Sequence, residues 1–158
     1  MQDTGTADHS NVAMALYDVL RSRLSYRDWM ISVGQFSVEI GEEVRVADVL
    51  LAPTASVPRK AISTGNAILL AEVLSLSSKG PDFGSKRHLY QALGSLEIYV
   101  VASQDEPRLW IWQRTRDAAR HFPEQPLEVQ DRTAMIHLER LNVFFTLHDV
   151  YRHVFPID

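Results

Sequence analysis

Apolar residues recur at helical spacing near the start of the chain and at strand spacing after it. One face of a helix predicted over residues 10–24, with Asp8 or Ser10 as its N-cap, carries Val12, Leu16, Val19, Leu20 and Leu24. Between residues 31 and 40 apolar and polar positions alternate, which predicts a strand. Gly41 and the two glutamates after it predict a turn into a second strand over residues 44–51, so the two strands should form a hairpin.

The remainder of the chain alternates between apolar runs and polar connections. A long connection over residues 52–66 leads to an almost wholly apolar run at 68–75, which is typical of a central strand covered on both faces. A helix is predicted from residue 82 or 83 to 93, where Gly94 ends it. Two strands at 95–103 and 108–113 follow, then short strands at 134–138 and 142–145 and a closing helix at 147–154.

This order predicts one α/β domain, more narrowly α+β, over residues 9–158, behind a flexible lead-in over residues 1–8. A strand, helix, strand order favours a crossover between parallel strands, whereas the last long pair favours a hairpin. We therefore expect a mixed central β-sheet flanked by helices.

The amino-acid composition excludes several functional classes. The 158 residues contain no cysteine, which excludes disulfides, thiolate metal ligands and a cysteine nucleophile. The formal net charge of −4 argues against a protein that coats nucleic acid non-specifically, but it leaves room for a nuclease with an acidic metal-binding pocket. No apolar stretch is long enough to span a bilayer, and the first residues show no signal pattern. We expect a cytoplasmic protein with no membrane partner.

Two acids interrupt the apolar runs, Asp48 in the run 44–51 and Glu72 in the run 68–75. A lone carboxylate in a buried strand is costly unless a metal ion, a lysine or an arginine compensates its charge. Side chains alternate across a strand, so each acid shares a face with apolar neighbours. If the two strands are neighbours, both carboxylates could converge near one end of the sheet. Magnesium takes oxygen ligands and keeps several waters, so two carboxylates and a substrate phosphate would suffice.

The helix after the second acid carries a lysine. Lys86 has Asp82 four residues before it and Tyr90 four residues after it, which places all three along one helical stripe. A lysine beside a metal ion could orient the attacking water or neutralise charge that develops on a phosphate. Each residue also has a simpler interpretation: Asp48 in a salt bridge, Asp82 as an N-cap, Lys86 in solvent and Tyr90 in the core.

Other polar residues carry weaker signals. The six histidines lack metal-ligand spacing, and His9 is most simply a capping or exposed residue. Trp110 and Trp112 are expected to pack against the core. A local basic patch of Arg114, Arg116 and Arg120 is typical of a solvated face. The sequence contains no Gly-rich phosphate loop and no nucleophile elbow.

Four segments, in this order, resemble the Uma-two family of predicted restriction endonucleases within the PD-(D/E)XK superfamily. They are Ala47-Asp48-Val49, then Ala71-Glu72-Val73-Leu74-Ser75, then Asp82 with Lys86 and Tyr90, then Ser95-Leu96-Glu97-Ile98-Tyr99-Val100-Val101. His9 falls where that family commonly has a histidine. The resemblance extends from His9 to the closing helix and is strongest between Arg45 and Trp112.

The resemblance implies a restriction-endonuclease-like fold and magnesium-dependent hydrolysis of DNA phosphodiester bonds, with manganese as a possible substitute. It implies that Asp48 and Glu72 are metal ligands and that they act with Lys86 as the catalytic residues. Asp82, Tyr90 and His9 would be accessory. Leu74 stands where the superfamily's lysine would be, so activity would depend on Lys86 reaching the site from its helix.

Two other functions stay open. A relative of the same fold that no longer cleaves could serve as a nucleic-acid-binding or protein-binding module, and the net negative charge and the small basic patch favour that interpretation. A structural homodimer could use the apolar run around Phe144 and Phe145 as its interface. A homodimer is expected for the nuclease as well.

Overall fold

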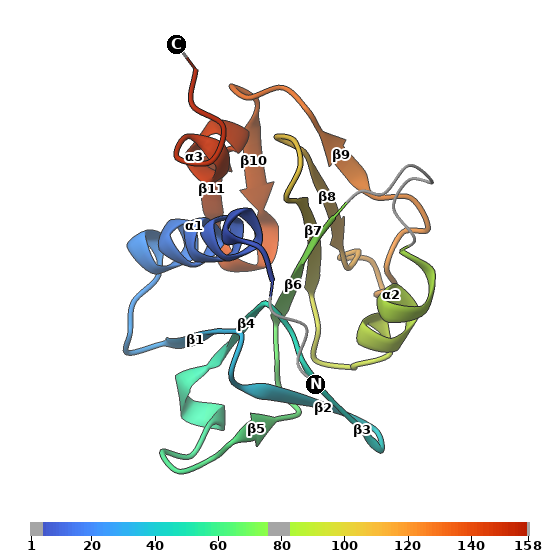
Figure 1. The fold of residues 1–158 in the computed structure, drawn as a ribbon. Helices are drawn as coiled ribbons and strands as arrows, with labels where there is room; N and C mark the ends of the chain where they lie inside the picture. Colours follow the sequence, from blue (N-terminus) through green and yellow to red (C-terminus); the bar gives the residue numbers. More distant parts are fainter. Residues whose placement is uncertain (1–4, 76–82, 158) are drawn as a thin grey trace.

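The computed structural model describes residues 5–75 and 83–157 and shows a six-stranded mixed sheet with a helix on each face (Figure 1). The strand order is β1-β4-β6-β7-β8-β9, and its bounds are β1 Trp29–Val33, β4 Val49–Pro53, β6 Leu69–Leu74, β7 Ile98–Ser103, β8 Leu109–Gln113 and β9 Leu127–Val129. Within this sheet, as far as the structure describes it, β6 and β7 are the one parallel pair, and helix α2 (Gly84–Gln91) lies between them in the sequence. The expected mixed sheet flanked by helices is confirmed.

Two smaller sheets extend the domain. One has the order β3-β2-β5, with β2 Ser37–Ile40, β3 Glu43–Val46 and β5 Ser63–Thr64. The other pairs β10 (Met135–Leu138) with β11 (Val143–Thr146), and two short 3₁₀ turns lie at Thr54–Ser56 and Glu139–Leu141. Among the described residues, no helix is long and apolar enough to cross a membrane.

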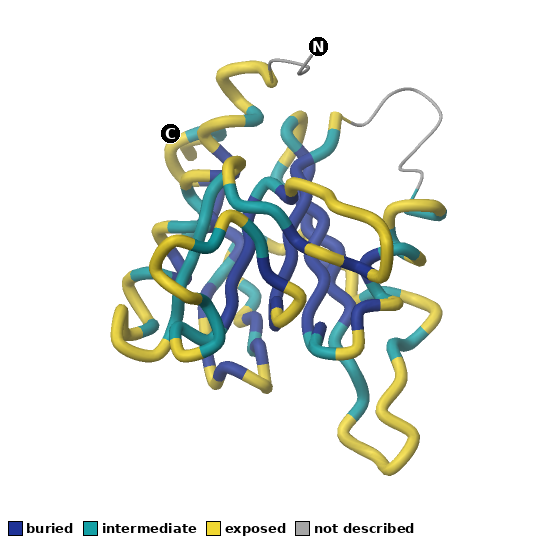
Figure 2. Tube along the Cα trace, turned by 90° about the horizontal axis from the view of Figure 1, so that it is seen from below, coloured by how far each residue is buried: buried dark blue, intermediate teal, exposed yellow. Residues whose placement is uncertain are grey.

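Helix α1 (Ala7–Arg23) packs its predicted apolar stripe on one face of the central sheet. Its stripe meets Leu69, Ala71 and Val73 of β6, and the strands beneath it are the most buried part of the chain (Figure 2). The helix begins three residues before the predicted start because the Thr6 hydroxyl accepts a hydrogen bond from the His9 backbone N–H at 3.1 Å. The predicted N-caps were therefore wrong, and the last two residues of the expected lead-in are helical.

The predicted strand over residues 44–51 is divided into two strands that belong to different sheets. β3 pairs with β2, whereas β4 pairs with β1 and β6, and the chain changes sheet at Ala47 and Asp48. The predicted strand over residues 31–40 is divided in the same way near Gly34, whose φ is +66°. The prediction that Asp48 lies inside a strand was wrong: it lies in the junction between β3 and β4. The predicted hairpin exists as β2–β3, with Gly41 at φ +59° in its turn.

The C-terminal elements match their prediction closely. β10, β11 and helix α3 (Leu147–Tyr151) follow in the expected order, and Thr146 and Asp149 form a capping box at the start of α3. The apolar run expected to form an interface is split by strand alternation. Phe145 is buried in the core, whereas Phe144 is exposed and stacks on His137. Phe145 is therefore not available as an interface residue.

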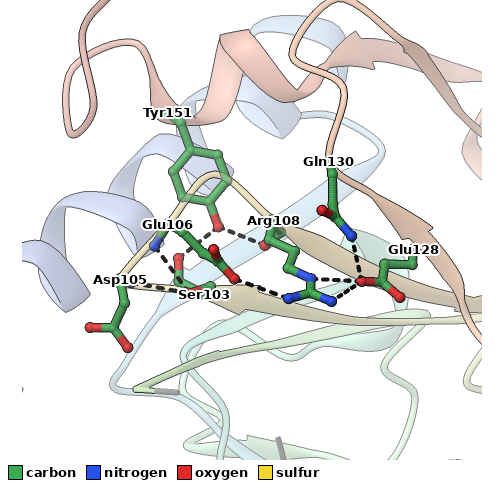
Figure 3. Close-up of polar contacts among 7 residues, drawn as sticks. All are labelled: Ser103, Asp105, Glu106, Arg108, Glu128, Gln130 and Tyr151. Atoms are coloured by element: carbon green, nitrogen blue, oxygen red, sulfur yellow. Dashed lines mark hydrogen bonds and ion pairs between the residues drawn. The ribbon is translucent and has the colours of Figure 1, made fainter. Parts of the chain in front are cut away.

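Tyr151 joins α3 to the turn between β7 and β8 (Figure 3). Its buried hydroxyl lies 2.7 Å from the Ser103 carbonyl oxygen and 2.9 Å from that of Arg108. Tyr151→Phe leaves these acceptors without the hydroxyl, so we expect a loss of about 1–2 kcal/mol of stability. Differential scanning calorimetry should show a melting temperature lower by roughly 3–6 °C. The control Tyr26→Phe, at an exposed position, should change it little, and equal melting temperatures for all three proteins would contradict this role.

Candidate functional site

The strand pairing brings Asp48 level with Glu72. β4 and β6 are antiparallel, with Leu50 opposite Leu70 and Val49 opposite Ala71, so the next residue along each strand would be Asp48 opposite Glu72. Asp48 has left the strand, but its Oδ2 accepts the Val73 backbone N–H at 2.7 Å. The Asp48 side chain thus accepts a hydrogen bond that a backbone carbonyl of a neighbouring strand would otherwise accept. This hydrogen bond holds the carboxylate at the end of the sheet.

Glu72 lies on the sheet face that α2 covers. Leu70, two residues earlier on β6, packs in one cluster with Leu50, Tyr90 and Tyr99, while the odd-numbered residues of β6 face α1. Glu72 is only 4% exposed, and it is the only buried acid in the described ranges 5–75 and 83–157. The expectation of an acid in a buried central strand is therefore confirmed. By the same alternation, Asp48 belongs to the Leu50 side, so both acids occupy one face.

The surroundings of Glu72 raise its pKa. Burial is the largest cause, repulsion from the Asp48 carboxylate adds to it, and together they raise the pKa of Glu72 to about 7. The Lys86 ammonium and the hydroxyl of Tyr90 act in the opposite direction but do not restore an ordinary value. Burial and the neighbouring carboxylate therefore outweigh the positive charge of Lys86 at Glu72.

Helix α2 directs two predicted residues at Glu72. The Tyr90 hydroxyl donates to Oε1 at 2.7 Å, and Lys86 Nζ lies 3.7 Å from Oε2. The spacing of four residues places both on one helical face, as predicted. Tyr90 is fully buried, whereas the Lys86 side chain is 59% exposed, so Lys86 reaches the acid from the rim of the site. Asp82, the third residue of the predicted stripe, lies outside the described residues.

Aromatic packing fixes α2 on the sheet. Tyr90 meets Tyr99 of β7 edge to face at 5.6 Å between ring centroids, and Tyr99 stacks on Trp112 of β8 at 5.5 Å. Phe83, just before the helix, packs against both tryptophans, which are buried as expected. This packing determines where Lys86 and Tyr90 lie relative to Glu72.

His9 approaches the site from the opposite face of the sheet. Its Nε2 lies 3.2 Å from Asp48 Oδ2, the oxygen that also accepts the Val73 N–H. His9 lies in the first turn of α1, not ahead of the helix as the sequence predicted. Among residues 5–75 and 83–157, no lysine or arginine pairs with the Asp48 carboxylate, and this imidazole is the basic side chain that contacts it.

The donor set suits a hard divalent cation that keeps much of its water. The described part of the chain contains no group of three or more histidine, aspartate or glutamate side chains placed to hold a metal ion. Asp48 and Glu72 nevertheless supply two carboxylates on one face, and the two side chains lie close enough to share a hydrogen bond. Because magnesium binds through one or two carboxylates with water and substrate phosphate, the pair fits this ion.

Two contributors to the site were missed by reasoning from the sequence. The Val73 backbone N–H holds Asp48 in place, and Tyr99 supports Tyr90. Burial and the nearby Glu72 and Asp48 carboxylates raise the pKa of Tyr99 well above its usual range. Tyr99 could have been found as the polar-tipped residue of an otherwise apolar strand. The hydrogen bond from the Val73 N–H to Asp48 could not have been found from the sequence, because it depends on the break between β3 and β4.

Comparison with known proteins finds a solved structure of similar fold. No family model and no curated protein matches the sequence. Among solved structures, the chain is similar to a crystal structure described as a "putative nuclease belonging to DUF820" from Anabaena variabilis ATCC 29413, with a TM-score of 0.75 and 12% sequence identity. The match covers 98% of this chain and 86% of that one. The chain therefore has the fold of that nuclease-like protein.

Proposed function

We propose that this chain is a metal-dependent endonuclease of the PD-(D/E)XK superfamily, related to the Uma-two family, that hydrolyses phosphodiester bonds of DNA. The observation that carries the proposal is the placement of Asp48 and Glu72 level on one sheet face, with Lys86 Nζ 3.7 Å from the second carboxylate. The similarity in fold to a protein described as a putative nuclease supports it. The chemistry of the donor set favours magnesium, with manganese as a substitute.

Each side chain has a distinct role in this proposal. Asp48 and Glu72 bind the cation, which when bound supplies a water of lowered pKa and positive charge beside the phosphate. Lys86 presents its ammonium at the exposed rim, where it neutralises the charge that the phosphate gains as water oxygen attacks phosphorus and the ester P–O bond breaks. The hydroxyl of Tyr90 and the ring of His9 act as positioning groups, because they hold Glu72 and Asp48 respectively.

The hydrogen bonds leave one side of the carboxylate pair available. Tyr90 engages Oε1 of Glu72, and both the Val73 N–H and the His9 ring engage Oδ2 of Asp48. The remaining oxygens are Glu72 Oε2, which pairs with the exposed Lys86 ammonium, and Asp48 Oδ1. A hydrated cation between the two carboxylates would replace the hydrogen bond that they share. A substrate phosphate would then approach from the side on which Lys86 lies.

A nuclease assay with Lys86→Ala tests the proposal. We expect the wild type to cleave linear or circular DNA with magnesium or manganese. Lys86→Ala should cleave roughly 100-fold more slowly, because the variant lacks one cationic group beside the reacting phosphate. Lys60→Ala, which removes an exposed lysine from a loop, serves as the matched control and should keep wild-type activity.

The same assay separates nuclease from binding module. Absence of cleavage by the wild type on single-stranded and double-stranded substrates, with both metals, would contradict the nuclease proposal. If DNA then still bound, as a mobility-shift assay can measure, the non-cleaving module would be the better interpretation. Equal cleavage rates for Lys86→Ala and the wild type would remove Lys86 from the catalytic set.

A further inference from the structure

A polar cavity lies at the end of the central sheet opposite the carboxylate pair. It has a volume of about 230 Å³ and is lined by Glu97, Thr115, Arg116, Arg120 and Arg140. Glu97 directly precedes β7, whereas the residue of β7 paired with Glu72 is Val101, four positions further along. At about 3.3 Å per residue, the cavity lies some 13 Å along the strand from the level of the carboxylate pair. It is thus separate from the proposed metal site.

The loop that carries two of the arginines is held in one conformation by its own hydrogen bonds. The Thr115 backbone N–H donates to the His121 carbonyl at 2.8 Å, and the His121 N–H donates to the Thr115 hydroxyl at 3.1 Å. Behind the loop, the partly buried Arg114 donates through Nη1 to the Arg120 carbonyl at 3.0 Å and through Nε to the Leu96 carbonyl at 2.7 Å. Arg114 is therefore structural, and Arg116 and Arg120 are presented by a closed loop.

Arg120 has a backbone conformation that favours glycine. Its φ is +41°, and its N–H donates to both the carbonyl and the carboxylate of Asp117. A non-glycine residue in the left-handed region is uncommon and raises the energy of the folded state. Here the conformation brings the guanidinium to the Glu97 carboxylate at the wall of the cavity.

The third arginine comes from a different, equally anchored segment. Arg140 lies in the 3₁₀ turn Glu139–Leu141, and that turn is fixed to β8 because Gln113 accepts the Glu139 N–H at 2.9 Å and donates to the His137 carbonyl. Arg116 pairs with Glu139 at 3.4 Å, and Arg120 pairs with Glu97. Among the described residues, Arg140 is in neither of these ion pairs. The cavity therefore has one guanidinium more than its carboxylate partners neutralise.

We propose that this cavity binds a phosphate group. Guanidinium groups bind phosphate through paired, charge-assisted hydrogen bonds, and three converge here from two rigid segments. The volume far exceeds the roughly 30 Å³ that one water occupies. A phosphate of a nucleic-acid backbone and a phosphate of a small molecule share this chemistry. The proposal does not depend on nuclease activity, because the cavity shares no residue with the carboxylate pair.

Isothermal titration calorimetry with pyrophosphate, in buffer with EDTA and no divalent metal, tests the proposal. We expect wild-type binding to weaken at least about tenfold in the double variant Arg116→Ala, Arg140→Ala. A second double variant, Arg116→Ala with Arg140→Lys, keeps the positive charge at position 140. It should bind pyrophosphate more tightly than the double alanine variant does. Arg59→Ala, which removes an exposed arginine from a loop elsewhere, should bind as the wild type does. Circular dichroism of each variant checks that the fold is unchanged.

A second arm uses fluorescence anisotropy with a short DNA duplex, also with EDTA. Loss of both pyrophosphate and DNA affinity in the double variant would identify a nucleic-acid backbone as the source of the phosphate. DNA binding by the double variant should then depend less on salt concentration than binding by the wild type does. Loss of pyrophosphate affinity alone would identify a small phosphorylated ligand. Equal pyrophosphate affinity in the wild type and the double variant, or absence of binding to the wild type, would overturn the proposal.

Discussion

Glu72→Gln should make the protein more stable at pH 8, by up to about 3 kcal/mol, while it abolishes cleavage. Burial and the Asp48 carboxylate raise the pKa of Glu72 from 4.5 to about 7 in the folded protein. Each unit of that difference corresponds to about 1.4 kcal/mol, and the unfolded chain escapes the penalty because its carboxyl group is in water. Glutamine has nearly the same shape, carries no charge and can still accept the Tyr90 hydroxyl.

The stability that Glu72→Gln gains over the wild type should increase with pH. Between about pH 4.5 and 7 the folded wild type holds a proton on Glu72 that the unfolded chain has lost, so wild-type stability falls as pH rises through this window. Glu72→Gln has no ionisable group at this position, so its free energy of unfolding lacks this pH dependence. The free energies of unfolding of the wild type and the variant should therefore diverge with increasing pH and remain separated above pH 7. Urea unfolding at pH 5, 6, 7 and 8 measures the difference.

A matched substitution controls for a general effect of removing negative charge. Glu42→Gln, in the exposed turn between β2 and β3, should follow the wild type at every pH. If Glu72→Gln also followed the wild type, the buried carboxylate would not carry the penalty inferred here. Stability gained at the expense of activity is common where a site places charge in an unfavourable environment.

The magnesium requirement for cleavage should change strongly between pH 6 and 8. A carboxylate must be deprotonated to bind a metal ion, so protons and magnesium compete at Glu72. With a pKa of about 7, the deprotonated fraction falls from about nine-tenths at pH 8 to about one-tenth at pH 6. At magnesium concentrations below saturation, we expect cleavage to be about tenfold slower at pH 6, as initial rates on a fluorescent DNA substrate would measure.

Because protons and magnesium compete at Glu72, more magnesium should reverse the loss of cleavage rate at pH 6. Raising the magnesium concentration about tenfold should restore most of the rate at pH 6, because mass action offsets the smaller deprotonated fraction. A rate that does not change between pH 6 and 8, or one that rises toward acid pH, would contradict a metal site that includes Glu72. The Lys60→Ala control should show the wild-type pH profile.

The buried acid and the helix after it could be predicted from local pattern alone. Glu72 stands in an apolar run long enough to identify a central strand, and Lys86 and Tyr90 are four residues apart on a helix, so their common face follows from helical geometry. The crossover between β6 and β7 followed from the order of the elements. These features depend on residues close together in the sequence.

The surroundings of Asp48 could not be predicted, because they depend on long-range pairing. The apolar run around Asp48 reads as one strand, yet its two halves pair with different sheets. Only that division leaves the Asp48 side chain free to accept the Val73 N–H. The closeness of His9 likewise depends on where α1 crosses the sheet, a packing property with no local signal. The hairpin from β10 to β11 shows the reverse case, where alternation suffices to place Phe145 inside and Phe144 outside.

Calorimetric titration of manganese and of magnesium into the metal-free protein at pH 8 tests the central claim most directly, namely that Asp48 and Glu72 together bind a divalent cation. We expect the wild type and Glu42→Gln to bind the ion, and we expect Asp48→Ala and Glu72→Gln to lose binding, with both variants folded by circular dichroism. Absence of binding to the wild type, with or without DNA, or undiminished binding to both site variants, would contradict the claim.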